Sequence, residues 1–466
     1  MTIQVSPSPM PNSDTVKLTS TLLDKDAYLT GLLEQIIATK TAGWLQELRD
    51  RATNWVRHST IPTNREEEWR FTDLSELRKL QFQVDRQLKS TDISSLTLPE
   101  AAHSRLVFVN GVYASELSAV AGLPSGVVVS NLAGLSESEQ QRVNQYLAEA
   151  EGAQEVFTAL NTAGISDAAV IWVAKNVSVE TPIHLVFISV AGEKPIISQP
   201  RCLVVAETGS QVSLIEEYTN RLRVASRRED AKSAEEEGVY FTNAVTEIWL
   251  AENAEVNHTR VERESTEAFH IGKTAVTQAR DSRYTCHAIT LGGKLSRHNL
   301  EVLQTGEQTL TTLNGLTIAL GHQLADTHSA IALNHPYSIS RQLHKCIVGD
   351  RAHAVFNGKV FVPKPAQLTD AAQLNRNLLL SSKARVDTKP QLEITADNVK
   401  CAHGATVSQL EDDEIFYLQS RGIDENDARN LLINAFAAEI ISQIPIPSLQ
   451  KILLSTVNSL KSLPQD

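Results

Sequence analysis

The sequence predicts a mainly β protein whose core is a parallel β-helix, with α-helical regions before and after it. Three observations support this fold class. Amphipathic helical patterns lie at the two ends of the 466-residue chain, short β-type runs fill the stretch between them, and no helical segments separate those runs. The lack of intervening helices argues against a doubly wound α/β sheet and leaves a stacked β-solenoid or a large sandwich. We favour the β-helix, because each of its coils buries a face against the next.

The first region, residues 1–104, is predicted to be helical. Apolar residues recur at helical spacing over two successive stretches, 29–37 and 44–56. Ile61 and Pro62 then end the second helix, because the residue before a proline resists the α conformation. The segment 64–73 that follows is a dense mixture of charged and aromatic side chains, which favours a docking or capping role.

The second region, residues 105–410, is predicted to form the β-helix. Apolar residues alternate there with period two, and runs such as 170–173 and 184–190 are typical of strands. The runs are spaced irregularly, so no fixed repeat is visible. Two Asn-Gly pairs are interpreted as turn signals near strand ends: Asn314 with Gly315, and Asn357 with Gly358.

The third region, residues 411–466, is predicted to contain two amphipathic helices that begin after Gly422. Asp424 can cap the first of them, because a carboxylate accepts hydrogen bonds from the free N–H groups at a helix start. The prolines within 444–447 separate the two helices. This pair either packs on its own β body or docks another subunit. The apolar stripe of the first helix includes Leu431, Leu432 and Phe436.

Charge and hydropathy narrow the function classes. Lys and Arg total 43 against 55 Asp and Glu, a formal net charge of −12, which argues against a nucleic-acid-binding surface. No apolar run reaches the roughly 18 residues that a membrane-spanning helix needs, and the first residues lack the features of a secretory signal. We therefore expect a cytoplasmic protein. The acidic stretch 220–238 is interpreted as a solvated surface loop.

The cysteines point to the same compartment. They lie far apart and form no C-x-x-C pair, so we expect reduced thiols rather than a disulfide framework. They are Cys202, Cys286, Cys346 and Cys401. Without a further signal, each is interpreted as a buried, inert thiol.

Catalytic templates are absent from the sequence. It contains no G-x-S-x-G elbow, no H-E-x-x-H motif and no Walker lysine loop. An enzyme acting on polysaccharide would need carboxylates in one groove, and the candidates are Asp387, Glu393 and Asp397. Two histidine groups could also share a groove: His322, Asp326 and His328, and then His335 and His344. The structural alternative for these groups is a ladder of satisfied polar side chains.

Cys401 and His403 carry a sharper signal. In a strand, residues i and i+2 project from the same face, so the thiol and the imidazole lie close together. That pair suits zinc, copper or the iron of an iron–sulfur species. Two ligands do not fill a coordination sphere, so the others must come from elsewhere in the fold or from another chain. The alternative is a buried thiol beside a polar strand residue.

Several longer segments carry a resemblance to a known family. The most specific are 373–394, 397–406 and 416–422, and weaker matches lie at 65–72 and 321–328. Together they make the sequence similar to the SufB/SufD family of Suf iron–sulfur cluster assembly scaffolds over most of its length.

The resemblance follows the SufD form of this family. SufB carries a cysteine followed by Asp-Ser shortly before the aligned Val-Asp-Thr stretch, whereas residues 378–383 contain no cysteine. The SufD form implies a right-handed parallel β-helix between helical regions, and a subunit that is not an enzyme by itself. It also implies assembly with SufB, a paralogue of similar fold, and with the ABC-type ATPase SufC.

The same resemblance implies roles for particular residues. His403 would take part in cluster formation at the SufB interface, with Cys401 as a less certain contributor, and residues 424–463 match the part that docks SufC. The iron–sulfur cluster would be transient in the complex, with none bound tightly by the isolated chain, which could form a homodimer. Sulfur donors and acceptor apoproteins would be indirect partners. Cys202, Cys286, Cys346 and the stretch 220–238 receive no role.

Two rival functions stay open at this point. The first is an acid/base enzyme acting on polysaccharide, which would turn over substrate as an isolated chain. The second is a purely structural brace within a heteromeric complex, which would contribute no ligand atoms to a cluster.

Overall fold

The computed structural model describes residues 25–37, 43–87, 91–220 and 238–459. The acidic stretch interpreted as a surface loop falls on residues 221–237, which lie outside the described residues, as do the first 24 residues. Among the residues that are described, no helix is both long and apolar enough to cross a membrane.

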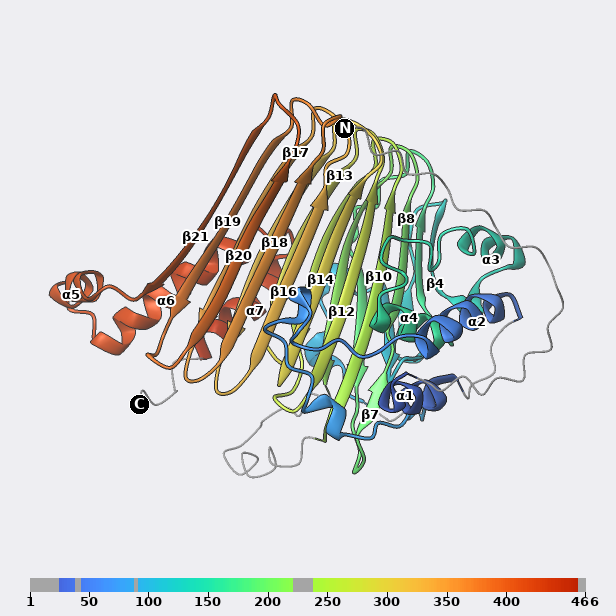
Figure 1. Ribbon diagram of the computed structural model, residues 1–466, viewed down its shortest axis with the longest axis horizontal. Helices are drawn as coiled ribbons and strands as arrows, with labels where there is room; N and C mark the ends of the chain where they lie inside the picture. Colours follow the sequence, from blue (N-terminus) through green and yellow to red (C-terminus); the bar gives the residue numbers. More distant parts are fainter. Residues whose placement is uncertain (1–24, 38–42, 88–90, 221–237, 460–466) are drawn as a thin grey trace, which may run out of the picture.

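The core is a solenoid of two long sheets whose neighbouring strands are parallel, with antiparallel pairs only where β1, β2, β3, β4 and β5 begin the stack. From β8 onward, successive strands alternate between the two sheets, so each pair of strands forms one coil (Figure 1). The parallel β-helix predicted from the sequence is therefore confirmed, and the sandwich alternative is wrong.

The strands of each sheet have the following bounds. Sheet A contains β4 (Val127–Asn131), β5 (Ala169–Val173), β7 (Ile196–Ser198), β8 (Arg201–Ala206), β10 (Tyr240–Leu250), β12 (Phe269–Gln278), β14 (Leu295–Gln304), β16 (Leu324–Ala332), β18 (His353–Val362) and β20 (Arg385–Ile394). Sheet B contains β1 (Ser104–Val109), β2 (Val112–Tyr113), β3 (Ala119–Val120), β6 (Ile183–Ser189), β9 (Gln211–Asn220), β11 (Glu255–Arg263), β13 (Arg283–Thr290), β15 (Leu310–Ala319), β17 (Ile339–Val348), β19 (Asp370–Leu379) and β21 (Lys400–Gln409).

The inward faces of the two sheets stack in columns along the solenoid. Val276, Val302, Ile331 and Val360 share one column of sheet A, and none is more than 2% exposed. Each such aliphatic side chain contributes about 1.5–3 kcal/mol through burial. Other columns are polar, and Gln373 Nε2 donates to Gln342 Oε1 of the preceding coil at 2.8 Å. Apolar and polar columns side by side explain why the sequence shows no clean repeat.

The two Asn-Gly pairs do not form turns, which corrects their interpretation from the sequence. Gly315 lies inside β15 and Gly358 inside β18. A Cβ atom at Gly315 would lie 2.0 Å from His344 Nδ1, and one at Gly358 would lie 2.3 Å from Gln373 Nε2. Glycine is needed at both positions because a neighbouring inward side chain crosses the space that its side chain would fill.

The N-terminal region contains two α-helices, α1 (Ala27–Ile37) and α2 (Gly43–Arg57), where the periodicity predicts them. The expectation of helix up to residue 104 is wrong beyond Arg57. In the described residues of that stretch, 58–87 and 91–104, the helical segments are single turns of 3-10 helix: η1 (Glu67–Trp69), η2 (Leu77–Lys79), η3 (Ser94–Leu96) and η4 (Pro99–Ala101). These residues lie along the solenoid, and tertiary contacts rather than helical hydrogen bonds fix their conformation.

Two helices interrupt the β region, which corrects the expectation that it contains none. They are α3 (Glu137–Val143) and α4 (Val156–Ala163), inserted between β4 and β5, and a further 3-10 turn, η5 (Leu132–Gly134), precedes them. The Ser136 hydroxyl accepts from the Glu139 N–H, and Glu139 bonds back to Ser136, which is a capping box. Both helices lie at the start of the solenoid and leave its parallel topology unchanged.

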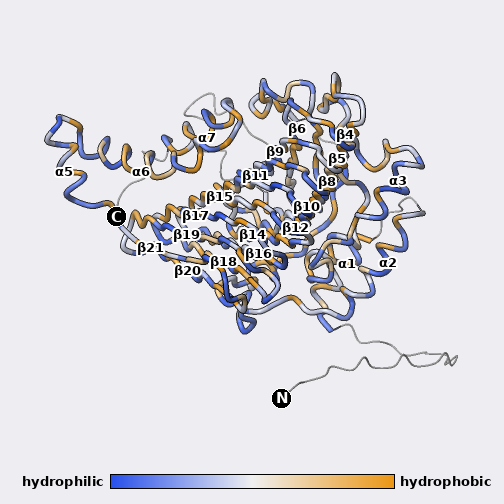
Figure 2. The backbone as a smooth tube through the Cα atoms, turned by 90° about the horizontal axis from the view of Figure 1, so that it is seen from above, coloured by the Kyte–Doolittle hydropathy of each residue, from blue (hydrophilic) through white to orange (hydrophobic). Residues whose placement is uncertain are grey.

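The C-terminal region forms α5 (Asp412–Ser420), α6 (Glu425–Ile441) and α7 (Pro447–Ser459). Helix returns at Asp412, earlier than the expected start after Gly422, whereas the cap at Asp424 is confirmed by its bond from the Asn426 N–H at 2.9 Å. Buried residues of α6 and α7 pack on outward apolar residues of sheet B, and Figure 2 shows both helices beside β15 and β17. In Figure 1, α5 extends away from the solenoid body.

Candidate functional site

The solenoid has an open end at its last coil. Within the described part of the chain, β21 pairs with β19 alone and β20 pairs with β18 alone, so each sheet ends there with an unpaired strand. Most residues of β21 are exposed, whereas the inward residues of β19 are buried. An unpaired strand presents free N–H and C=O groups, which is the usual requirement for adding another chain.

Cys401 and His403 lie on this terminal strand and continue two inward columns. Cys401 is in register with Ala371, and His403 with Gln373, whose side chains are 2% and 3% exposed inside the solenoid. Cys401 is half-buried against the main hydrophobic core, and His403 is exposed because no later coil covers it. The two candidate ligands therefore share one face, as the period-two spacing predicts, and they lie where the lumen opens.

The surroundings of Cys401 favour its protonated form in the isolated chain. Burial raises the pKa of the thiol, the Ala371 backbone opposes this shift, and the Asp370 carboxylate adds to it. The thiolate is the form that binds metal. Metal binding at Cys401 therefore has to displace a proton, or an added positive charge has to stabilise the thiolate.

No third protein ligand joins this pair. Over the described ranges, the three-ligand group in the molecule consists of Glu262, Glu264 and His270, deep in the solenoid, and includes neither Cys401 nor His403. Any coordination sphere at the open end is incomplete within this chain. The spacing left open whether further ligands come from elsewhere in the fold or from another chain, and a source in another chain stays a prediction.

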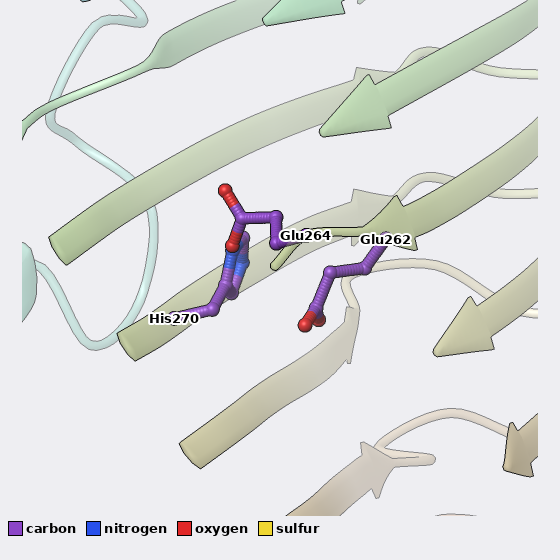
Figure 3. Close-up of side chains that lie close together, drawn as sticks. All are labelled: Glu262, Glu264 and His270. Carbon is purple, nitrogen blue, oxygen red and sulfur yellow. The ribbon is translucent and has the colours of Figure 1, made fainter. Parts of the chain in front are cut away.

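Figure 3 shows the group of Glu262, Glu264 and His270, and the Arg260 guanidinium supplies a cation beside it. Arg260 Nη2 donates to His270 Nε2 at 2.5 Å, so the ring hydrogen is on Nδ1, which donates to Glu264 Oε2 at 2.8 Å. Arg260 Nη1 also lies 3.6 Å from Glu262 Oε2. A metal ion would have to displace this buried guanidinium, so the arrangement is better explained as an internally neutralised polar cluster.

Burial dominates the electrostatics of that polar cluster. It raises the pKa of Glu264 to about 8, even though Thr242 and Arg260 act in the opposite direction. It lowers the pKa of His270 to about 4, with Arg260 adding to the effect and Glu262 opposing it. The sequence offered no signal for this cluster, because its members meet only when β11 and β12 are brought together.

The remaining cysteines are buried inside the solenoid and unpaired. Burial raises the pKa of Cys346 to about 12 and the pKa of Cys202 well above its ordinary value. Both are inert thiols in this environment, as the sequence analysis expected.

Of the carboxylates and histidines that could have formed a groove, Asp326 and His328 lie 3.0 Å apart on the outer face of sheet A, and the candidate carboxylates Asp387 and Glu393 each pair with a basic residue instead. Asp387 pairs with His353 at 2.7 Å, and Glu393 pairs with Lys359 at 2.8 Å, on the outer face of sheet A. Asp397 lies in the turn before β21. Among the histidines, His328 is on the outer face of sheet A, whereas His344 is buried in the lumen and stacks on Phe356. The Asp326–His328 pair is covered by the Thr72 and Glu68 side chains, which makes it part of a packing contact.

Two weakly matching segments of the sequence meet in space. The segment 65–72, which we call the strap, lies on the outer face of sheet A and contacts the segment 321–328. The Thr72 hydroxyl donates to Asp326 Oδ2, and Arg297 Nη1 donates to the same oxygen at 2.5 Å. The guanidinium of Arg297 also stacks 3.9 Å from the Trp69 ring centroid. The sequence marked both segments but gave no sign that they pair.

The residues proposed for partner docking on α6 differ in their accessibility. Leu431 is 50% exposed, whereas Leu432 and Phe436 are half-buried. Phe436 packs into the interface between α6 and sheet B, where its carbonyl accepts from Lys345 Nζ at 2.8 Å. The neighbouring α5 exposes Phe416 and Tyr417. Leu431 therefore remains available to a partner, while Phe436 mainly holds α6 in place.

Comparisons with known proteins agree with this architecture. Residues 187–436 match the family model described as SUF system FeS cluster assembly, SufBD core domain, and residues 28–185 match that of the SufBD protein N-terminal region. The chain is 48% identical over 440 residues to an iron-sulfur cluster assembly SufBD family protein of Synechocystis sp., covering 94% of this chain and 95% of that protein.

Two further relatives come from a plant and a bacterium. The protein ABCI7, chloroplastic, of Arabidopsis thaliana is 36% identical over 86% of this chain and 83% of its own length. The iron-sulfur cluster assembly protein SufD of Escherichia coli is 34% identical over 85% of this chain and 88% of its own length. These similarities extend over both the solenoid and the N-terminal region.

Proposed function

Because the chain belongs to the SufBD family of iron–sulfur cluster assembly proteins, we propose that it is a scaffold subunit that lends ligand atoms to a nascent cluster shared with a partner chain. The observation that carries the proposal is the position of Cys401 and His403, on one face of an unpaired terminal strand where the lumen opens. A SufB-like subunit, of similar fold, would dock at this open end and supply the missing ligands.

In this proposal the cluster is cargo and not a resident cofactor. His403 is the main donor, because its side chain is exposed at the open end, and Cys401 assists once its thiol has lost its proton. Two donors hold a cluster weakly, so the isolated chain keeps none. Sulfur donors and acceptor apoproteins would act on the assembled complex. The free cysteines favour a reducing, cytosol-like compartment.

The proposal is tested by His403→Ala in the complex assembled with SufB-like and SufC-like partners. We expect iron and sulfide content after anaerobic reconstitution to fall to background, because the main donor of this chain is lost, while co-purification of the partners is unchanged. His322→Ala, an exposed histidine in the turn before β16, is the matched control and should reconstitute like the wild type. Unchanged iron and sulfide in the His403 variant would exclude its role.

The rival functions receive less support from the geometry. An acid/base enzyme needs two carboxylates in one groove, whereas Asp387 and Glu393 are each held by a basic partner on the outer face of sheet A. A brace without ligand atoms predicts that the iron-edge spectrum of the reconstituted complex is the same with and without His403.

An ATPase subunit of the SufC type would dock on the C-terminal arm formed by α5 and α6. Three apolar side chains there are largely exposed: Phe416, Leu431 and Tyr417, whose ring is approached only by Arg421 among the contacts of the described residues. Groups of exposed apolar side chains are typical of protein interfaces. Those of the arm lie on helices that follow β21 and extend past the last coil, on the same side of the solenoid as the open end (Figure 1).

For the variant Leu431→Asp we expect binding of the ATPase subunit to weaken by at least about tenfold, because a charge replaces an apolar contact. Binding of the SufB-like subunit should be unchanged. Asn426→Asp adds the same charge at an exposed position in the first turn of α6, where it suits the helix dipole, and serves as the control. Equal affinities of both variants, measured by titration, would place the ATPase elsewhere.

A further inference from the structure

The strap, residues 65–72, crosses four neighbouring strands of sheet A on the outer face of the solenoid. Trp69 stacks on Arg297 of β14, and Thr72 bonds to Asp326 of β16. The Glu68 carboxylate approaches His328 of β16 at 3.2 Å and Asn357 of β18 at 3.5 Å.

The strap also reaches the last strand of sheet A. Glu67 forms an ion pair with Lys389 of β20, and the Phe71 ring lies 6.0 Å from the Arg385 guanidinium at the start of the same strand. In Figure 1 the N-terminal chain lies across β12, β14 and β16. A single short segment therefore adds links across four strands that are also joined by ladder hydrogen bonds and by side-chain pairs such as His353–Asp387, and it reaches the open coil.

His328 is the link that depends on protonation. Its Nδ1 lies 3.2 Å from Glu68 Oε2 on the strap, and its Nε2 lies 3.0 Å from Asp326 Oδ1 on β16. A neutral imidazole has one N–H and can donate to only one of these carboxylates. With Arg297 Nη1 3.2 Å from Nε2, that N–H is on Nδ1, so the neutral ring keeps an uncharged bond to Glu68 and loses its bond to Asp326. The charged imidazolium has two N–H groups and can bridge the strap and the sheet.

The charges around His328 come from every element that packs on it. The strap contributes Glu68, β14 contributes Arg297 with Nη1 at 3.2 Å from His328 Nε2, and β16 contributes Asp326. From β18, the Lys359 charge acts to lower the pKa of Glu68, and the Asp326 charge acts to raise the pKa of His353, which also belongs to β18. Burial and Arg297 act to lower the pKa of His328, but Asp326 and Glu68 outweigh them, so its pKa is raised.

We propose that the strap is a proton-linked brace that keeps the last strand of the open end in place. Charged His328 binds the strap to sheet A, and neutral His328 binds it more weakly. The docking role of that end rests on the proposed function, whereas the brace itself does not. The sign follows from the raised pKa. Docking is strongest below the ordinary histidine value and weakens as pH rises through the pKa of the docked state.

The brace is tested by hydrogen exchange of the strap in the isolated full chain between pH 6 and pH 9, after correction for intrinsic exchange. We expect protection of residues 65–72 to fall as pH rises, by up to about tenfold per pH unit, because one proton is linked to docking. In His328→Gln, protection should be low and independent of pH. His322→Gln, which changes an exposed histidine in the turn before β16, should behave like the wild type. Protection that is flat in the wild type, or that keeps its pH dependence in His328→Gln, would overturn the proposal.

The link to the open end is tested with Glu67 and Lys389. Glu67→Lys should reduce protection of both the strap and β20, and the charge-swapped pair Glu67→Lys with Lys389→Glu should restore it. If β20 exchanges equally in all three proteins, the strap does not hold the last strand. These measurements use the isolated chain and do not involve a cluster. The brace can therefore be excluded while the role of His403 in cluster formation stands, and the role of His403 can be excluded while the brace stands.

Discussion

Acidification from pH 7 to pH 5 is expected to lower the free energy of unfolding steeply, well before most carboxylates are protonated. The cause is a set of neutral histidines buried in or against the solenoid. Burial lowers the pKa of His270, His287 and His344 to about 4, and it lowers the pKa of His298 well below its ordinary value. In the unfolded chain the same side chains titrate near their ordinary value of about 6.5.

The sign follows from where the protons bind. Between pH 6.5 and pH 4 the unfolded chain takes up protons that the folded chain cannot accept, so stability is present above the unfolded pKa and is lost as pH falls. Each group contributes a slope of about 1.4 kcal/mol per pH unit, and four together approach about 5 kcal/mol per unit. Glu264 offsets one share of this loss, because its raised pKa of about 8 lets the folded chain take up a proton over a range in which the unfolded carboxyl stays charged. Domains are typically stable by about 5–15 kcal/mol, so the loss that remains is still a large part of the stability of the fold.

His258 provides an internal contrast. Burial acts to lower its pKa, but Cys286 and the Glu216 carboxylate, 2.8 Å from Nε2, raise it to about 9. His258 is therefore charged in the folded state at neutral pH. Its contribution to the free energy of unfolding is fully present below pH 6.5 and is lost as pH rises toward 9. His258 therefore takes no part in the loss of stability at acid pH.

Chemical unfolding at pH 5, 6 and 7 measures this slope. His344→Gln should reduce the slope by about 1.4 kcal/mol per pH unit, the share of one proton, whatever its effect on absolute stability. His322→Gln, which changes an exposed histidine, should leave the slope unchanged. If wild type and His344→Gln give parallel lines, buried histidines are not the source of the acid sensitivity.

These histidines also explain why part of the fold could not be predicted from the sequence. Period-two alternation identified strands whose inward residues are apolar, such as β5 and β6. It missed β12 and β19, whose inward columns contain His270 and Thr274, and Asn375 and Asn377. Period-two alternation is visible only when one face of a strand is apolar and the other polar. Where hydrogen-bonded polar side chains also point into the lumen, both faces are polar and the alternation disappears.

For the candidate site too, features that depend on neighbouring residues could be predicted from the sequence, and features that depend on distant residues could not. Strand geometry alone places Cys401 and His403 on one face, because side chains two residues apart project from the same side of a strand. Their spacing in the sequence is therefore enough to predict this. That they lie on the terminal strand depends on how many coils precede them, which no local pattern contains. The contacts of the strap are the hardest to predict. Thr72 and Asp326 are 254 residues apart in the sequence, and nothing in their local patterns indicates that they pair once the sheet has formed.

The largest loss of stability from a single substitution is expected at Glu247 of β10. Its carboxylate accepts from Arg201 Nη2 at 2.5 Å and from the backbone N–H groups of Ala148 and Ala150, at 3.0 Å and 3.2 Å. Both members of the pair are 2% exposed. Glu247 thus ties the chain between α3 and α4 to sheet A and neutralises a guanidinium that water cannot reach.

Glu247→Ala should therefore cost about 3–5 kcal/mol of unfolding free energy, because it leaves Arg201 charged, buried and without its counter-ion. Glu393→Ala removes one partner of an ion pair whose side chains are 41% and 49% exposed, and it should cost about 1 kcal/mol or less. Chemical unfolding of the two variants at neutral pH gives the comparison. Equal losses would mean that the Arg201–Glu247 pair is better solvated than its position suggests.

The double variant Arg201→Met with Glu247→Leu separates the two possible origins of that loss. If attraction between the charges stabilises the fold, the double variant should be at least as unstable as Glu247→Ala. If the cost is that of leaving a charge buried and unpaired, replacing both side chains by apolar ones should recover much of the stability. We expect the second result, limited by the Ala148 and Ala150 N–H groups and by Asn161 and Thr162, which would lose their bonds to the pair.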